Sequence, residues 1–328
     1  MARFSPEQPF ENRPDRLSEA EEALYKILVP ENKLKAIKIE DFGDLYGEGT
    51  IAADREKVAV YEARFRKEEE DPIEATRKQR RELFEAITNF GIEEGGWLGA
   101  DTTVVRPSRY DDIIGGVDSV VEFPQRKGVV ALKIDITKSD DLEKKFASIK
   151  ESIENGWLSR VKYFNSPDFR GELKFVPGVV IGADHRTMTE IVDLILKFKR
   201  TRTDIQRLAA AGEKAKVKER GHDLEQIGKQ IAHHPMQMKI IFEIRAQLEN
   251  FRDYAGKVIV DEAKRKKVVS AYTRVLEIID SIEREKSETE EWSDLEKDFK
   301  EAGEDMVCHA IIMEANKIGG RKSSELVE

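Results

Sequence analysis

The sequence predicts an α/β protein, with an αβββαβ core between a helical N-terminal lead and a helical C-terminal extension. Three observations predict this class. First, an amphipathic segment is followed by three short strand-like segments. Second, another amphipathic segment and a fourth apolar run come after these strands. Third, the rest of the chain has helical periodicity. We divide the 328 residues into a lead at 1–72, a core at 73–200 and a helical region at 201–328.

The lead offers one clear helix. Ser18 is a suitable N-cap for a helix over 19–29, whose first turn is rich in glutamate. Residues 40–71 combine glycine, short apolar pairs and an acidic run, and we interpret them as irregular or partly helical.

The core begins with a helix over 73–90. Leu83, Ile87 and Phe90 recur at helical spacing, so they form one apolar stripe. Three strands are expected next, at 102–105, 117–123 and 128–137. A turn of Pro, Gln, Arg, Lys and Gly joins the second and third of them as a hairpin.

A helix, a loop and a buried strand complete the core. Ser139 is the expected N-cap of a helix whose apolar stripe continues to Ile153. Residues 154–172 contain glycine and proline and are interpreted as a loop. The unbroken apolar run at 175–181 is typical of a buried strand, and Asp184 then caps the next helix.

Helices are expected from there to the end of the chain. Their spans are about 185–200, 201–216, 222–255, 259–287 and 291–317. Apolar stripes in the helices at 222–255 and 259–287 predict an antiparallel helical hairpin, which packs on the core or on a second copy of the chain.

Two charged residues in the third strand are the most informative local feature. Lys133, Asp135 and Thr137 share one face of that strand, while the alternate residues are apolar. Charged side chains are rarely placed on a buried strand without a function. A further aspartate, Asp118, stands at the start of the second strand.

This pattern resembles the core of the PD-(D/E)xK, or restriction-endonuclease-like, nuclease superfamily. The resemblance covers about 110–130 residues of the chain. It implies that Asp118 and Asp135 hold a divalent metal, Mg²⁺ or Mn²⁺, for phosphodiester hydrolysis. It also implies that Glu85 on the first helix completes the site, with Glu82 as the alternative, and that a lysine orients the attacking water.

The position of that lysine departs from the family pattern. Thr137 occupies the place two residues after the second acid where the family has lysine. Lys133 is the best substitute, because it lies on the same face as Asp135, whereas Lys138 should point the opposite way. Lysines on the following helix are the other candidates: Lys144, Lys145 and Lys150.

Several residues allow a structural interpretation as well. Asp118 and Asp135 are alternatively a turn aspartate and an ion-pair partner of Lys133. Asp111 and Asp112 are assigned to a loop turn rather than to the site. Glu122 shares the face of Asp118 and is kept as a fallback ligand. The remaining histidine and cysteine candidates lack partners at zinc spacing: His233, His234, Cys308 and His309.

A basic stretch follows the core. Its candidate nucleic-acid-binding residues are Lys197, Lys199, Arg200, Arg202 and Arg207. The alternative is a solvated helix whose charges pair with the acidic segment at 280–305. The net charge of −9 makes nonspecific coating of nucleic acid unfavourable, so binding requires a local basic patch.

These features predict a metal-dependent nuclease, with DNA favoured over RNA as the substrate. The alternative is a catalytically inactive nuclease-fold protein that binds nucleic acid or acts as a scaffold or oligomerisation module through its C-terminal helices. One cysteine, no signal-peptide pattern and no long apolar run predict a cytoplasmic location and no membrane partner.

Overall fold

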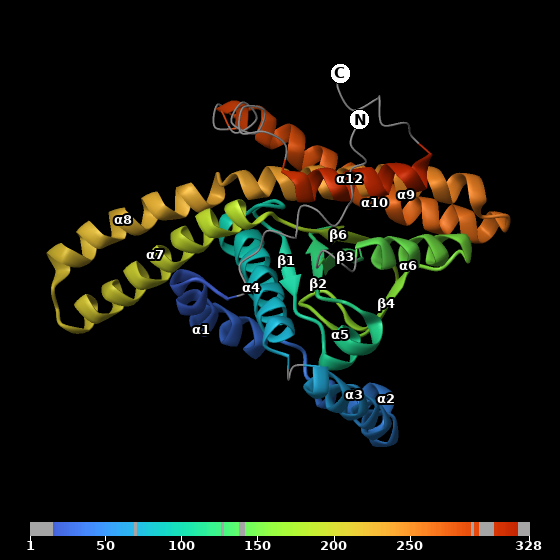
Figure 1. The fold of residues 1–328 in the computed structure, drawn as a ribbon, viewed down its shortest axis with the longest axis horizontal. Coiled ribbons are helices and arrows are strands. Elements are labelled where there is room, and N and C mark those ends of the chain that lie inside the picture. The colour runs from blue at the N-terminus through green and yellow to red at the C-terminus, as the bar shows by residue number, and fades with distance from the viewer. Residues whose placement is uncertain are drawn as a thin grey trace.

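The chain folds around a small mixed β-sheet that is surrounded by helices (Figure 1). The computed structural model describes residues 16–68, 71–125, 128–137, 142–289, 292–294 and 305–320. The expected N-cap Ser139 therefore lies outside the described residues, as does part of the helix expected over 291–317.

The N-terminal lead is more helical than the sequence predicted. Its elements are α1 (Glu19–Leu34), η2 (Ile39–Phe42), α2 (Gly43–Tyr46) and α3 (Glu48–Glu68). The capping box of Ser18 and Glu21 begins α1, as expected for this N-cap. The described part of 40–71 is mostly helical, which goes beyond the irregular or partly helical interpretation: Ile51 of α3 is buried with Phe42 and Tyr163, and polar contacts add to this packing. The buried Asp54 of α3 accepts a 2.7 Å hydrogen bond from the Tyr163 hydroxyl.

The core elements follow in sequence with two additions. They are α4 (Pro72–Gly95), β1 (Thr103–Val105), α5 (Arg109–Gly115), β2 (Ser119–Phe123), β3 (Val130–Ile136), α6 (Leu142–Glu154), β4 (Ser159–Asn165), β5 (Arg170–Val176) and β6 (Gly178–Ile181). The short helix α5 and the hairpin of β4 and β5 are the additions to the predicted order.

The four-stranded sheet has the order β1-β2-β3-β6. β2 is antiparallel to both β1 and β3, and β6 is parallel to β3. β4 and β5 form a separate two-stranded antiparallel sheet. The loop expected over 154–172 was therefore wrong in part: β4 alternates buried Val161 and Tyr163 with more exposed residues, and its short pattern is framed by glycine and proline.

The two faces of the sheet bury different partners. Leu132, Ile134 and Ile136 of β3 join the large core that also contains residues of α4, α9 and α10. Ala131, on the opposite face, packs with Val161 and Val176 from the β4–β5 hairpin. The predicted alternation on the third strand is confirmed, and the charged face of β3 therefore lies outside the large core.

The predicted fourth strand is divided by Pro177. β5 ends before this proline and β6 begins after it, so only the second half of the apolar run joins β3. The Pro177 carbonyl accepts a 2.8 Å hydrogen bond from the Lys133 amide, which begins the β3–β6 pairing.

Long helices form the rest of the described chain. They are α7 (His185–Ala210), α8 (Lys214–Ala232), α9 (Pro235–Val258), α10 (Glu262–Ser287) and α12 (Met306–Gly319). Asp184 caps α7 as predicted, with a 2.7 Å hydrogen bond from the Thr187 amide. The prediction of a single helix over 222–255 was wrong. The helix is interrupted before Pro235, and α9 starts at this proline with His234 as its N-cap.

The C-terminal helices have two roles in the architecture. α7 and α8 form a hairpin that extends away from the sheet on one side, and α9 and α10 form the predicted hairpin on the other side of the molecule (Figure 1). α12 packs along α9. No helix in the described part of the chain is long and apolar enough to cross a membrane.

Candidate functional site

The two aspartates singled out in the sequence come together at one end of the sheet. Ser119 of β2 pairs with Ile134 of β3, so the next position along each strand brings Asp118 opposite Asp135. The Ile136 amide donates a 2.6 Å hydrogen bond to Oδ2 of Asp118. This bond fixes the Asp118 carboxylate against β3 although the residue itself precedes β2.

Two lysines hold the Asp135 carboxylate. Lys145 of α6 contacts Oδ1 of Asp135 and also donates to the Ile136 carbonyl at 2.5 Å. Lys133 places its Nζ 3.6 Å from Oδ2 of Asp135. All three charged side chains are between 13 and 19 % exposed. The structure therefore supplies a lysine from α6 in addition to the one on β3, whereas Lys150 pairs with Glu154 at 3.9 Å.

Glu85 approaches the aspartates from α4. Its Oε1 accepts a 3.0 Å hydrogen bond from the side-chain amide of Asn32 on α1. Burial, and next to it the negative charge of Asp118, raise the pKa of Glu85 to about 8. Burial and the charge of Asp135 likewise raise the pKa of Asp118 to about 7. The charge of Asp118 thus acts on Glu85 and the charge of Asp135 acts on Asp118, so the three acids form one electrostatic cluster.

A buried polar network connects this cluster to the N-terminal lead. Oδ1 of Asn32 accepts hydrogen bonds from Asn89 at 3.0 Å and from Arg106 at 2.8 Å. Asn89 in turn accepts a 2.8 Å hydrogen bond from Ser119, the residue after Asp118. Asn89 and Ser119 are 0 % and 1 % exposed. The network therefore links Glu85 and the Asp118 backbone to α1 through closed, water-poor contacts.

Sequence reasoning missed Asn32. The signal was present, because Asn32 continues the spacing of Leu24 and Leu28 and puts a polar side chain on the buried stripe of α1. The expected helix ended at residue 29, before Pro30, whereas α1 continues through this proline to Leu34.

Replacing Asn32 by leucine is expected to destabilise the protein by about 2–4 kcal/mol, because Glu85 loses its hydrogen-bond donor and the side chains of Asn89 and Arg106 each lose one buried hydrogen bond. Urea denaturation followed by circular dichroism measures the change. Lys26→Leu on the exposed side of α1 is the matched control and should shift stability by less than about 0.5 kcal/mol. An Asn32→Leu midpoint equal to that of the control would contradict the network's importance.

The comparisons with known proteins add no relative. No protein-family model, no curated protein and no solved structure matches this chain.

Other acidic candidates are engaged elsewhere. Glu82 accepts a 2.6 Å hydrogen bond from Tyr25 and pairs with Lys33 at 2.9 Å. Although burial alone would raise the pKa of Glu82, these two contacts lower it. Glu122 pairs with Ala131 in the sheet and accepts a 3.0 Å hydrogen bond from Ser166. It lies four residues from Asp118, about 13 Å along the strand, and is too distant to share a metal ion with it.

Asp111 and Asp112 lie in α5, so their assignment to a loop turn was wrong. Asp111 accepts hydrogen bonds from the Lys162 and Tyr163 amides at 2.7 and 3.0 Å and thereby attaches α5 to β4. Asp112 pairs with Arg109 at 2.5 Å, and its charge contributes to the raised pKa of Glu85. Asp111 is structural, while Asp112 adds negative charge near the cluster.

Two of the histidine and cysteine candidates, His234 and Cys308, are buried. His234 is buried and caps α9 by accepting a 3.2 Å hydrogen bond from the Met236 amide. Burial, together with the charge of Lys239, lowers the pKa of His234 to about 4. Cys308 is buried in α12. Among the residues that the structure describes, no three His, Cys, Asp or Glu side chains are arranged to enclose a metal ion.

The acidic cluster nevertheless has the donor chemistry of an open magnesium site. Mg²⁺ is commonly held by one or two carboxylates, with water and substrate oxygens in its other positions. Asp118 and Asp135 offer adjacent carboxylates, and their mutual repulsion is the kind that a divalent cation relieves. A metal at Asp135 would replace at least one of its lysine contacts.

The predicted basic residues occupy the first half of the α7–α8 hairpin. Lys199 contacts Glu31 of α1, and Arg202 lies 3.7 Å from Glu94 of α4. Arg207 pairs with Asp204 one turn before it, at 3.1 Å. Lys197 and Arg200 are exposed on α7. Lys199 and Arg202 therefore attach α7 to the helices around the site. The exposed Lys197 and Arg200 remain candidates for binding nucleic acid.

Proposed function

We propose that this protein is a metal-dependent nuclease similar to the PD-(D/E)xK superfamily, with nucleic acid as its substrate. The observation that carries the proposal is the convergence of Asp118, Asp135 and Lys145 at one end of the central strands of the mixed sheet. Glu85 approaches the same cluster from α4, as the resemblance implied.

The order of the elements supports this proposal. Without α5 and the β4–β5 hairpin, the chain reads α4, β1, β2, β3, α6 and β6, with β6 parallel to β3. This is the αβββαβ order of the family. Asp135 lies on β3 and Asp118 directly precedes β2, so both aspartates belong to the central pair of strands, where the family carries its metal ligands.

The site's residues suit phosphodiester hydrolysis. Asp118 and Asp135 would hold Mg²⁺ or Mn²⁺, which supplies charge stabilisation for the phosphate. Lys145 adds positive charge beside Asp135 and can hold or orient a water molecule there, and Lys133 provides a second ammonium group on the other carboxylate oxygen. Glu85 adds a carboxyl group whose proton is released near neutral pH.

Asp135→Asn is expected to abolish cleavage, because it removes the carboxylate that both lysines and the metal require. The measurement is cleavage of labelled single- and double-stranded DNA and RNA by the full chain, with Mg²⁺ or Mn²⁺ compared with EDTA. Glu122→Gln is the matched control, since Glu122 lies on the same sheet face at the opposite end. It should retain wild-type activity.

The result separates the proposal from its alternative. Metal-dependent cleavage that is lost in Asp135→Asn and kept in Glu122→Gln assigns the site. No cleavage of any substrate by the wild type would contradict the nuclease proposal and favour a catalytically inactive binding or scaffold protein.

A further inference from the structure

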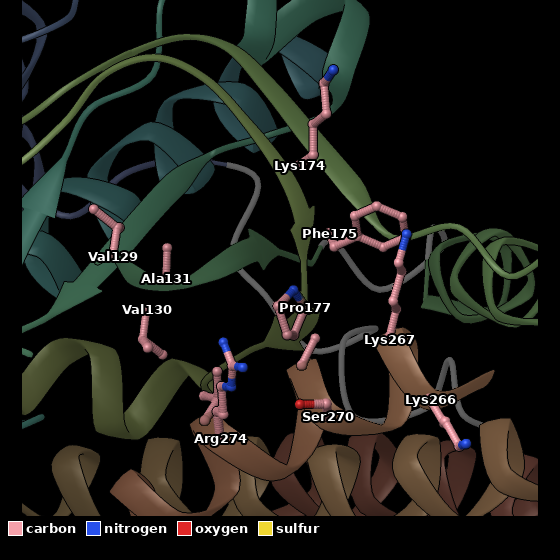
Figure 2. Close-up of a pocket in the computed structure, with 12 residues that line it drawn as sticks. Val129, Val130, Ala131, Lys174, Phe175, Pro177, Lys266, Lys267, Ser270 and Arg274 are labelled. Atoms are coloured by element: carbon pink, nitrogen blue, oxygen red, sulfur yellow. The ribbon is translucent and has the colours of Figure 1, made fainter. Parts of the chain in front are cut away.

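A pocket separate from the acidic cluster lies between β3, the end of β5 and α10. Its volume is about 500 Å³, within the range typical of small-ligand sites. It exists because β6 begins at Gly178, opposite Lys133, so the earlier part of β3 has no strand beside it on that edge. α10 crosses this gap instead, and Val129, Val130 and Ala131 form one wall (Figure 2).

α10 gives this pocket a positive face. Lys267, Ser270 and Arg274 follow each other at intervals of three and four residues, which places them on one side of the helix. In Figure 2 the Lys267 amine approaches Phe175 and the Arg274 guanidinium extends toward Pro177. No carboxylate is among the residues that line the pocket. In the described part of the chain, neither Lys267 nor Arg274 has an ion-pair partner.

The other two lysines of the pocket differ. Lys174 and Lys266 direct their amines away from the cavity (Figure 2). They are neutralised by Glu172 at 3.1 Å and Glu262 at 2.7 Å. The positive charge available to a ligand therefore comes from Lys267 and Arg274.

Phe175 adds a flat apolar surface in an unusual backbone conformation. Its φ of 59° makes it a non-glycine residue with positive φ, which is costly for a bulky side chain. The Lys267 Nζ lies 5.6 Å from the centre of its ring. Pro177 and Val275 continue the apolar surface. A ligand whose planar group stacks on Phe175 could therefore place an anionic group near Lys267 and Arg274 of α10.

We propose that this pocket binds a nucleotide, with its phosphate between Lys267, Ser270 and Arg274 and its base against Phe175. Guanidinium groups bind phosphate through paired hydrogen bonds, and aromatic rings stack on any base. The nucleotide is either a free mononucleotide or one unit of a nucleic-acid strand. The proposal does not rest on nuclease activity, since the pocket shares no residue with the acidic cluster.

The test is calorimetric titration of the full chain, without metal, with AMP, CMP, GMP and UMP separately and with inorganic phosphate. At least one mononucleotide should bind at least tenfold more tightly than phosphate. The double variant K267A/R274A should weaken that binding at least tenfold. Lys266→Ala is the matched control and should stay within twofold, because its amine points away from the pocket.

A fluorescein-labelled oligothymidylate of twelve nucleotides distinguishes the two sources. If the oligonucleotide binds and K267A/R274A abolishes that binding, the ligand of the pocket is a nucleic-acid strand. If only a mononucleotide binds, the ligand is a free mononucleotide. No binding of either, binding unchanged in the double variant, or equal affinity for phosphate and mononucleotide would overturn the proposal.

Phe175→Gly tests the stacking surface without imposing a new strain, because glycine accepts positive φ. The variant should retain the circular dichroism spectrum of the wild type and lose at least tenfold in nucleotide affinity. Its affinity for inorganic phosphate should stay within threefold. Nucleotide affinity equal to that of the wild type would remove the base from the pocket and overturn the nucleotide assignment.

Discussion

Replacing Lys145 by methionine is expected to lower the rate of phosphodiester cleavage by about 10²–10⁴-fold, the range typical of a positioned proton-transfer or charge-stabilising group. Lys145 joins the Asp135 carboxylate to the Ile136 carbonyl, and the proposed nuclease mechanism uses this ammonium group to orient the attacking water. Methionine keeps most of the apolar stem and removes the charge. Single-turnover cleavage at saturating Mg²⁺ measures the chemical step.

Two other lysines make the comparison specific. Lys133→Met removes the weaker contact with Asp135, at 3.6 Å, and should lower the rate by less than Lys145→Met. Lys150→Met removes a lysine of the same helix that pairs with Glu154, and it should have the activity of the wild type. A larger loss in Lys133→Met than in Lys145→Met would transfer the catalytic role to the strand lysine.

The sequence predicted the charged face of β3 because the signal was local. Alternation along β3 separates Lys133 and Asp135 from Leu132, Ile134 and Ile136, and this pattern depends only on the period of a strand. The pairing of Asp118 with Asp135 came from the resemblance to the nuclease core and not from the strand period. The hairpin register that brings Asp118, just before β2, opposite Asp135 is a property of the folded structure.

The choice among the lysines of α6 depended on longer distances. Lys144, Lys145 and Lys150 were equivalent candidates, because the rotation of α6 about its axis is set by its packing on the core. Phe146 and Ile153 are buried in that packing. This rotation directs Lys145 toward Asp135 and Lys150 toward Glu154, a result that helical periodicity alone does not select.

Contacts across the whole chain were the least predictable part. Asn32 and Glu85 are 53 residues apart and belong to helices that the sequence assigned to different regions. Residues 154–172, which hold β4 and the start of β5, were interpreted as a loop, because glycine and proline interrupt the pattern and the pairing of the two strands is irregular. Such contacts depend on how separate elements pack, whereas the patterns of a single sequence describe each element by itself.

Replacing Glu85 by glutamine is expected to stabilise the protein at alkaline pH when no metal is present. The folded state raises the pKa of Glu85 to about 8 and that of Asp118 to about 7, because burial and neighbouring carboxylates oppose their ionisation. The unfolded chain releases these protons near pH 4–4.5. The folded state therefore binds more protons than the unfolded state between these values, and stability falls as pH rises from about 4.5 to 8.

Glutamine keeps an oxygen for the Asn32 hydrogen bond and cannot ionise. The expected gain of Glu85→Gln over the wild type is about 2 kcal/mol at pH 8.5, after a discount for partial exposure, and it should vanish near pH 4.5. Urea unfolding in EDTA from pH 4.5 to 8.5 measures this difference.

Glu94→Gln, on the exposed side of the same helix, should have the pH dependence of the wild type. Saturating Mg²⁺ at pH 8.5 should stabilise the wild type more than Glu85→Gln, because the cation compensates the carboxylate that the variant lacks. A stability difference between wild type and Glu85→Gln that stays constant across the pH range would exclude Glu85 from the electrostatic cluster and leave Asp118 and Asp135 as the only acids of the proposed metal site.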